Sequence, residues 1–401
     1  MSFESLSEAL RCLTTFRGLL ELKEMQALQG LLSALEREPG ALRERYAQFL
    51  YSVREAGYSS LSRDLWEHLR YDETAFGRAV AWGREDPAFC EAARQDLAVL
   101  SQAASLSFHD LKIQMAARLP EQRSAILALP ELEQGQALAF DRLLEGYRRD
   151  GVGVFAKGRA FLWEHGSLRS VRNPDPITRE QMLLYSWQRE AVLENTRHLV
   201  QGAPAANVLL YGDSGTGKSA TIKSLVNEPE FGSLRVVEVG KNSLSSLTEL
   251  VRLVSEQPQK FILYLDDLCF ETSDRGYSAL KTALEGGLEN LPGNAVIYAT
   301  SNRRHLVRET FEDRQGSDIH RDETIQERTS LSERFGLRIL YMSLSKPEYL
   351  QMVRAMAVQA GLELAAEELE RRANQWEIQH GGRTPRVARQ FVDSLVAENS
   401  L

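Results

Sequence analysis

The segment YGDSGTGKS, from Tyr211 to Ser219, has the residue types of a loop that grips phosphate. It matches the pattern G-x-x-x-x-G-K-[ST] without a departure. Its glycines let the backbone fold so tightly that successive N–H groups point at the β- and γ-phosphates, and the following helix N-terminus adds partial positive charge. In such a loop Lys218 would neutralise the phosphates and Ser219 would bind magnesium. The predicted phosphate contacts are Gly212, Asp213, Ser214, Gly215, Thr216, Gly217, Lys218 and Ser219.

The residues on either side of the loop support this prediction. Val208 to Tyr211 have the pattern of a buried strand, and Ala220 to Val226 continue as a helix. A glycine-rich turn that binds nothing is the alternative. The order of strand, loop and helix favours nucleotide binding over that alternative.

Two adjacent carboxylates, Asp266 and Asp267, follow the apolar residues of FILYLDDL. They stand at the carboxyl end of a predicted strand, which is where ligands bind in parallel sheets. Asp266 is placed to hold the shell of a magnesium ion, and Asp267 is placed to orient or deprotonate an attacking water. The pair would alternatively cap the next helix. The phosphate loop upstream favours the roles in metal and water binding.

The order of motifs along the chain resembles that of AAA+ ATPases. After the phosphate loop and the acidic strand come a strand ending in Thr300-Ser301-Asn302, then SERFG at 332–336, and a late GGRTPR. More narrowly, YATSNRRHL, LSERFGL and RVARQF resemble a bacterial AAA+ ATP-binding family catalogued only as a domain of unknown function. The resemblance runs from about Asp175 to the C-terminus.

The resemblance implies roles for further residues. It makes Asn302 the polar sensor between the acidic residues and the γ-phosphate. Arg334 matches the arginine finger, which in AAA+ rings reaches the nucleotide of a neighbouring subunit; a surface salt bridge is the alternative. Arg386 matches the sensor arginine of the lid, with Arg383 as the alternative, and Gln188 lies where adenine contacts begin. The expected cofactors are ATP and Mg²⁺, and the expected assembly is a homo-oligomer.

Two functions stay open at this point. The first is an ATP hydrolase that remodels or loads an unknown protein partner. The second is a switch or loader with little hydrolysis that recruits a protein or DNA, because Asp267 stands where most hydrolysing AAA+ proteins have Glu. The segment 240–247 lacks the aromatic residue of protein-threading rings, which disfavours an unfoldase.

These motifs require an α/β core with flanking helical parts. The predicted AAA+ core is a five-stranded parallel sheet, with strands at 207–211, 235–239, 261–265, 295–300 and 338–343. Helices at 347–360, 366–379 and 385–398 predict a C-terminal lid, and helical spacing of apolar residues predicts an all-α N-terminal domain. Trp163 is expected in a helical core. The predicted divisions are an α-helical domain at 1–150, a linker at 151–177, the core at 178–345 and the lid at 346–401.

Composition excludes some classes of partner. The net charge of −8 gives no general attraction to nucleic acid, although Arg303, Arg304 and His305 form a basic cluster that leaves DNA binding open. No apolar run reaches the length of a membrane span, and no export signal is recognised. The three cysteines lie far apart, which favours reduced thiols and therefore a cytoplasmic protein.

Overall fold

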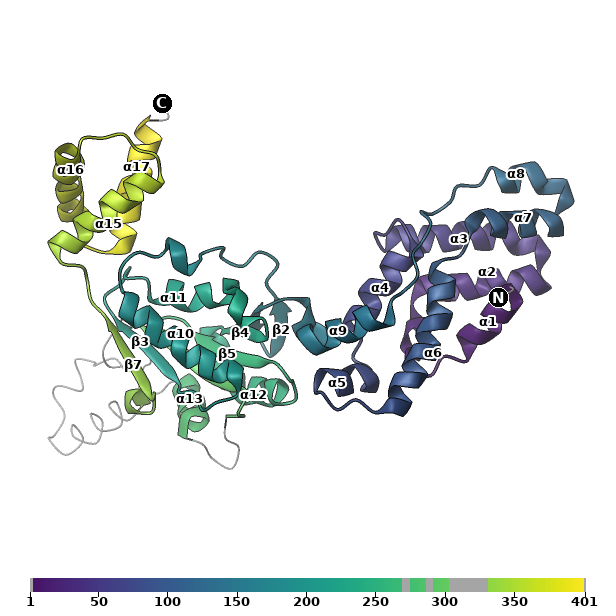
Figure 1. Ribbon diagram of the computed structural model, residues 1–401, viewed down its shortest axis with the longest axis horizontal. Coiled ribbons are helices and arrows are strands. Elements are labelled where there is room, and N and C mark those ends of the chain that lie inside the picture. Colours follow the sequence, from purple (N-terminus) through teal and green to yellow (C-terminus); the bar gives the residue numbers. More distant parts are fainter. Residues whose placement is uncertain (1–2, 269–274, 286–290, 303–330, 400–401) are drawn as a thin grey trace. The chain divides into compact units, whose positions relative to one another are not determined.

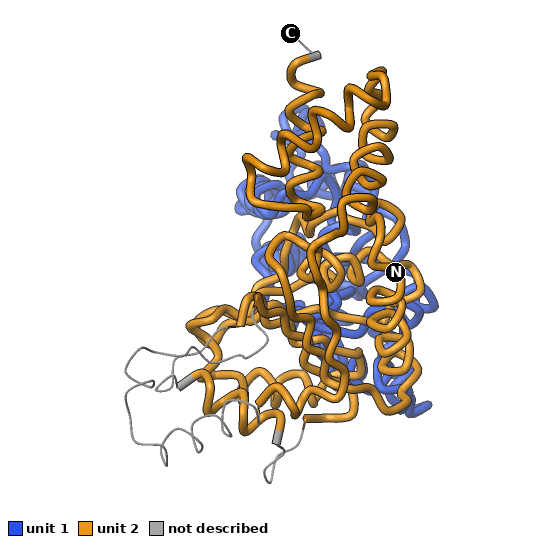
Figure 2. Tube along the Cα trace, turned by 90° about the vertical axis from the view of Figure 1, so that its left-hand side faces the viewer, with its two compact units in different colours: residues 1–157 blue, residues 158–401 orange. Residues whose placement is uncertain are grey.

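The computed structural model describes residues 3–268, 275–285, 291–302 and 331–399 (Figure 1). The chain divides into two compact units, Met1–Lys157 and Gly158–Leu401 (Figure 2). No described helix has the length and apolar character needed to cross a membrane. The basic cluster at 303–305 and Cys269 lie outside the described residues.

The first unit is helical, as predicted. Several of its helices begin at a residue whose side chain accepts a backbone N–H, such as Ser60, Thr74, Asp86 and Ser107. Leucines and aromatic residues on the inner faces form one continuous core. The helices are α1 (Phe3–Arg11), α2 (Lys23–Arg37), α3 (Leu42–Glu55), α4 (Leu61–Tyr71), α5 (Ala75–Ala81), α6 (Pro87–Ala104), α7 (Phe108–Arg118), α8 (Arg123–Leu127) and α9 (Phe140–Asp150).

A buried acidic residue, Asp64, lies inside this helical unit. Its side chain is completely buried on α4, and the Nε2 atom of His68 lies 3.4 Å from its Oδ1 atom. The two residues are one helical turn apart, so their side chains share one face of α4. The contact holds the pKa of His68 above its ordinary value.

The described residues of the second unit form a sheet of seven strands in the order β2-β1-β4-β5-β6-β3-β7. Strands β1 and β2 are antiparallel, and every other neighbouring pair is parallel. The strands are β1 (Ala160–Glu164), β2 (Ser167–Ser170), β3 (Val208–Gly212), β4 (Leu234–Val239), β5 (Lys260–Leu265), β6 (Ala295–Ser301) and β7 (Leu337–Tyr341).

Both faces of the sheet are buried at the central strands β4, β5, β6 and β3, which explains why these strands are nearly continuously apolar. Val208 and Leu210 pack with Ile222 on the face that is covered by α10 (Ser186–Gln201) and α11 (Lys218–Ser224). The alternate residues Leu209 and Leu263 are buried as well. Two further helices of the core are α12 (Leu247–Ser255) and α13 (Arg275–Glu285).

The sheet is larger than the five predicted strands because residues 160–170, which were assigned to a linker, form β1 and β2. A two-residue turn at His165 and Gly166 joins them, and both residues have positive φ angles of 51° and 73°. Gly151, Gly153 and Gly158 favour a linker by composition, whereas the glycine of the hairpin turn is Gly166. Trp163 accordingly lies buried in strand β1 and not in a helical core.

The helical lid follows β7 directly, as predicted. It comprises α15 (Lys346–Gln359), α16 (Ala366–Gln379) and α17 (Pro385–Asn399). Tyr349 and Met352 of α15 pack with Phe391 of α17 in a core of their own. A capping box between Ser345 and Glu348 begins the first of these helices.

Candidate functional site

The phosphate loop joins β3 to α11, and its glycines are required by its shape. Gly212, Gly215 and Gly217 have φ angles of 128°, 77° and 96°, a region that other residues rarely enter. A Cβ atom at Gly212 would lie 2.0 Å from the carbonyl oxygen of Tyr341. The loop therefore passes against the end of β7 at a distance that only glycine permits.

The ammonium group of Lys218 points back into this loop. Its Nζ atom donates to the carbonyl oxygens of Gly212 at 3.0 Å and Asp213 at 2.6 Å. Burial lowers the pKa of Lys218 from its ordinary value, with opposing contributions from nearby carboxylates. A buried cation thus stands at the centre of the backbone curve predicted to hold phosphates.

The carboxylate of Asp213 makes a contact in addition to the phosphate contact predicted for its backbone. Its Oδ2 atom accepts hydrogen bonds from both the backbone N–H and the hydroxyl of Ser343, each at 2.7 Å. These bonds hold the pKa of Asp213 below its ordinary value. The carboxylate ties the phosphate loop to the connection between β7 and the lid, and no local sequence pattern indicated this contact.

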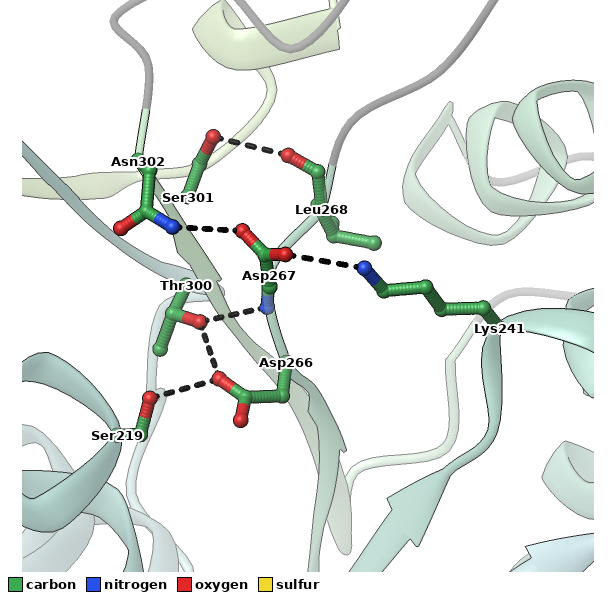
Figure 3. Close-up of polar contacts among 8 residues, drawn as sticks. All are labelled: Ser219, Lys241, Asp266, Asp267, Leu268, Thr300, Ser301 and Asn302. Atoms are coloured by element: carbon green, nitrogen blue, oxygen red, sulfur yellow. Dashed lines mark hydrogen bonds and ion pairs between the residues drawn. The ribbon is translucent and has the colours of Figure 1, made fainter. Parts of the chain in front are cut away.

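The hydroxyl of Ser219 and the carboxylate of Asp266 meet across the loop and the end of β5. Ser219 Oγ donates to Asp266 Oδ1 at 2.7 Å, and Thr300 Oγ1 donates to the same oxygen at 2.6 Å (Figure 3). Burial opposes ionisation of Asp266, but hydrogen bonding, led by the bond from Thr300, together with the nearby charge of Lys223 outweighs it and holds its pKa below the ordinary value. Asp266 is therefore an oriented carboxylate.

The carboxylate of Asp267 is engaged at both oxygens. Asn302 Nδ2 donates to Oδ1 at 2.8 Å, and Lys241 Nζ lies 3.1 Å from Oδ2 (Figure 3). The backbone at Asp267 has a φ of 52°, so the extended conformation of β5 ends before this residue. Its N–H donates to Thr300 Oγ1 at 2.8 Å. One threonine hydroxyl therefore orients both members of the acidic pair.

These oxygen atoms fit a magnesium ion that shares its coordination with phosphates and water. Mg²⁺ prefers hard oxygen ligands and keeps several waters, so one hydroxyl and one carboxylate suffice beside a nucleotide. The described residues contain no group of three or more His, Cys, Asp or Glu placed to hold a metal. Ser219 and Asp266 are the pair that would hold the ion.

A pocket of about 510 Å³ connects these groups with the lid. Its polar lining includes the phosphate loop, Asp266, Asp267 and Asn302. Its apolar lining includes a stacked pair, Tyr185 and Tyr341, whose ring centroids lie 5.1 Å apart. The apolar lining residues are Ile177, Met182, Leu183, Tyr185, Tyr341, Met352 and Met356.

The arginines expected at the site differ in their placement. Arg386 lines the pocket, and its backbone N–H donates to the carbonyl oxygen of Gly215 at 3.2 Å. Arg389 lines the pocket too, whereas Arg383 pairs with Glu377 at 2.6 Å. Arg334 is exposed just before β7 and is not among the pocket residues. The lid thus brings two arginines to the pocket of this chain.

The expected adenine contact lies beside the pocket and not in it. Gln188 is buried in α10, where Nε2 donates to the carbonyl oxygen of Leu340 at 3.5 Å. Its neighbours Tyr185 and Arg189 line the pocket in its place. Tyr185 has a left-handed backbone with a φ of 52° and donates from its hydroxyl to Met342. The left-handed conformation at Tyr185 determines which residues face the pocket. The spacing of apolar residues in the sequence does not reveal this conformation.

Comparison with known proteins identifies a family and some distant relatives. A family model described as "Protein of unknown function (DUF815)" matches residues 156–399. An ORC1-type DNA replication protein of Methanocorpusculum labreanum is 31% identical over 116 residues, which are 25% of this chain and 27% of that protein. The chain therefore spans about a quarter of the length of this curated relative.

Solved structures that match part of the chain share little sequence with it. The RuvB Holliday junction branch migration motor of Thermotoga maritima is 15% identical, with a TM-score of 0.32, over 54% of this chain and 63% of that one. The AAA domain of FIGL-1 in complex with ADP is 16% identical, with a TM-score of 0.37, over 56% of this chain and 74% of that one.

Proposed function

We propose that this chain, which belongs to the DUF815 family, is an AAA+ ATPase that binds ATP with Mg²⁺, hydrolyses it and uses the cycle to remodel or load a partner. One observation carries the proposal. The phosphate loop with Lys218 faces the same pocket as a continuous chain of hydrogen bonds that runs from Ser219 through Asp266, Thr300 and Asp267 to Asn302. A loop that only turned a strand into a helix would not need this arrangement.

Each residue has a part in the proposed reaction. The loop amides and Lys218 bind the phosphates, and Ser219 with Asp266 would hold Mg²⁺. Bound Mg²⁺ supplies positive charge to the phosphate oxygens. Asp267 orients a water and accepts its proton while the water oxygen forms a bond to the γ-phosphorus, the bond to the bridging oxygen breaks and ADP leaves. Asn302 holds the carboxylate of Asp267 in position.

The arginines make assembly part of this proposal. Arg386 acts from the lid on the nucleotide of its own chain. Arg334 acts on the nucleotide of a second copy, because it is exposed and stands outside the pocket of its own chain. An arginine supplied to the transferring phosphoryl group accelerates hydrolysis by about 10³ to 10⁵. We accordingly propose a cytoplasmic homo-oligomer whose lid and core move with the state of the nucleotide.

Magnesium-dependent ATPase activity at rising protein concentration tests this function. We expect activity per chain to rise with concentration, and to fall to background in Lys218→Ala. Lys346→Ala is the matched control, since Lys346 is an exposed lysine at the start of α15 outside the pocket lining. Activity that stays at background, or that survives Lys218→Ala unchanged, rules the function out.

A second candidate function follows from the side chain of Asp267. Aspartate is shorter than glutamate, and both of its oxygens already have partners in Asn302 and Lys241. A nucleotide-dependent switch or loader would bind ATP, hydrolyse it very slowly and recruit a protein or DNA. Tight ATP binding without turnover, even with the partner present, would select the switch.

Partner identity can be approached through the same residue. Asp267→Asn is expected to bind ATP without cleaving it and therefore to retain a partner through purification from cells. Recruitment of DNA would appear as salt-sensitive binding that is weakened by Arg303→Ala together with Arg304→Ala. Absence of DNA binding at low salt would leave the protein partner as the proposal.

A further inference from the structure

A buried tyrosine on β5 lies two residues before the carboxylate proposed to hold magnesium. Tyr264 is 1% exposed, and its hydroxyl oxygen has no partner in hydrogen-bond geometry among the described residues. Buried polar groups nearly always have such a partner, because without one they lose their bonds to water and gain nothing in return. The hydroxyl of Tyr264 is therefore a donor that the fold itself leaves unused.

The position of this hydroxyl points it toward the candidate site. Side chains alternate along a strand, so Tyr264 and Asp266 lie on the same face of the sheet. That face is covered by α11, which carries Ser219. Burial and the charge of Asp266 raise the pKa of Tyr264, and the hydroxyl of Ser219 acts in the opposite direction. Asp266 and Ser219 line the pocket and Tyr264 does not, so the phenol reaches the site only through them.

The other polar neighbours of Tyr264 do not take up its hydroxyl. The Nζ atom of Lys223 lies over the ring, 6.0 Å from its centroid. Glu238 stands opposite Tyr264 on β4, but no hydrogen bond joins the two side chains. The hydroxyl of Ser219 already donates to Asp266 at 2.7 Å. The carboxylate of Asp266 is therefore the acceptor best placed to pair with the phenol.

We propose that Tyr264 is a positioning residue of the metal site, and that its hydroxyl donates to the carboxylate of Asp266 when Mg²⁺ and nucleotide bind. The proposal rests on the nucleotide-binding function proposed above. Hydrogen bonds to a ligating carboxylate orient it and strengthen its hold on the metal. Thr300 supplies one such bond at 2.6 Å. Tyr264 would supply another from inside the sheet, at the side of Asp266 that water does not reach.

The first part of the test measures magnesium affinity in Tyr264→Phe. Binding of a fluorescent ATP analogue is titrated against Mg²⁺ and is also measured in EDTA. We expect the half-saturating Mg²⁺ concentration to rise about 10- to 100-fold, which is the usual effect of losing a hydrogen bond to a metal ligand. Affinity in EDTA should stay at the wild-type value, because the phosphate loop is unchanged.

The second part measures stability by hydrogen exchange of β5 and β6 in nucleotide-free protein. Tyr264→Phe removes a hydroxyl that has no partner, so the free energy of opening should stay the same or rise. Tyr298→Phe is the matched control. Tyr298 stands opposite Tyr264 on β6, and its hydroxyl is bonded to Asn195 and Thr196 at 2.9 Å each. This control should lose opening free energy and keep the wild-type magnesium dependence.

The outcomes separate this inference from the function on which it rests. If Tyr264→Phe keeps the wild-type half-saturating Mg²⁺ concentration, the inference is overturned and the nucleotide function stands. A loss of opening free energy as large as that of Tyr298→Phe would also overturn it, because the hydroxyl would then have a purely structural role. If the wild-type protein does not bind the ATP analogue at any Mg²⁺ concentration, the proposed function fails and the inference falls with it.

Discussion

Replacing Thr300 with valine tests whether one hydroxyl organises the acidic pair. Valine has nearly the same shape, but it can neither donate to Asp266 nor accept from the N–H of Asp267, two bonds of 2.6 Å and 2.8 Å. A hydrogen bond to a charged group contributes about 1.5–3 kcal/mol, and an unsatisfied N–H costs about 1–3 kcal/mol when fully buried and less at the partly buried Asp267. Because the two effects share one site, we expect a total loss of about 2–4 kcal/mol.

The change also has a predictable pH dependence. The hydrogen bond from Thr300 helps to hold the pKa of Asp266 below its ordinary value, so its loss raises that pKa in the folded protein. A carboxylate with a depressed pKa stabilises the fold above its unfolded pKa, and this stabilisation is lost as the pH falls through the folded pKa. Thr300→Val therefore has less of this stabilisation to lose, so acid should remove less stability from the second unit in Thr300→Val than in Thr300→Ser.

Local hydrogen exchange is the suitable assay, because a chain of two compact units need not unfold in one step. Exchange of peptides from β5 and β6 gives the free energy of opening around Thr300, and ATPase rates are measured on the same samples. Thr300→Ser keeps the hydroxyl and is the control. If the valine and serine variants have the same opening free energy, the same loss of it in acid and the same kcat, the hydroxyl does not organise the site.

Two further predictions concern the loop and the helical unit. Gly212→Ala should abolish ATP binding measured by calorimetry, because the added Cβ would meet the backbone of Tyr341 at 2.0 Å, whereas Gly217→Ala meets no atom within 4 Å and should lose less. A wild-type result for Gly212→Ala would contradict the close approach. The bond to Asp64 raises the pKa of His68 in the folded protein. It therefore stabilises the first unit below the unfolded pKa of about 6.5, and this stabilisation is lost as the pH rises through the folded pKa. Denaturation midpoints for this unit should therefore fall between about pH 6 and pH 8 in the wild type, and less in His68→Gln; equal slopes would contradict the pairing.

The sequence predicted those helices and strands whose own residues show a regular pattern of apolar side chains. The predicted lid helix at 366–379 has the observed bounds, and the strand predicted at 261–265 is observed as Lys260–Leu265. The helix has apolar residues at regular helical spacing, and the strand is a continuous apolar stretch bounded by polar residues. The β1–β2 hairpin was missed because its strands are short and Ser167–Ser170 has one apolar residue and no fully buried one. The hairpin is stabilised by the pairing of β1 with β4, and the composition of the hairpin does not reveal this pairing.

The candidate site was predictable in its residue types but not in its contacts. The phosphate loop and the acidic pair have spacings imposed by phosphate and metal chemistry, so they appear in the sequence. The bond from Ser343 to Asp213 joins residues 130 positions apart, and the pair of Lys241 with Asp267 spans 26. No local pattern encodes either contact. The left-handed backbone at Asp267 determines where its carboxylate points. Aspartate can adopt this conformation, so no glycine in the sequence indicates it.

The size of one effect decides how the hydrolase and the switch can be told apart. An arginine from a second copy changes the rate of hydrolysis by about 10³ to 10⁵. A preparation whose turnover is a hundredfold or more below that of an active ATPase is therefore explained by a missing neighbour. Raising the protein concentration is thus the decisive step, since turnover that stays negligible in the assembled protein leaves only the switch.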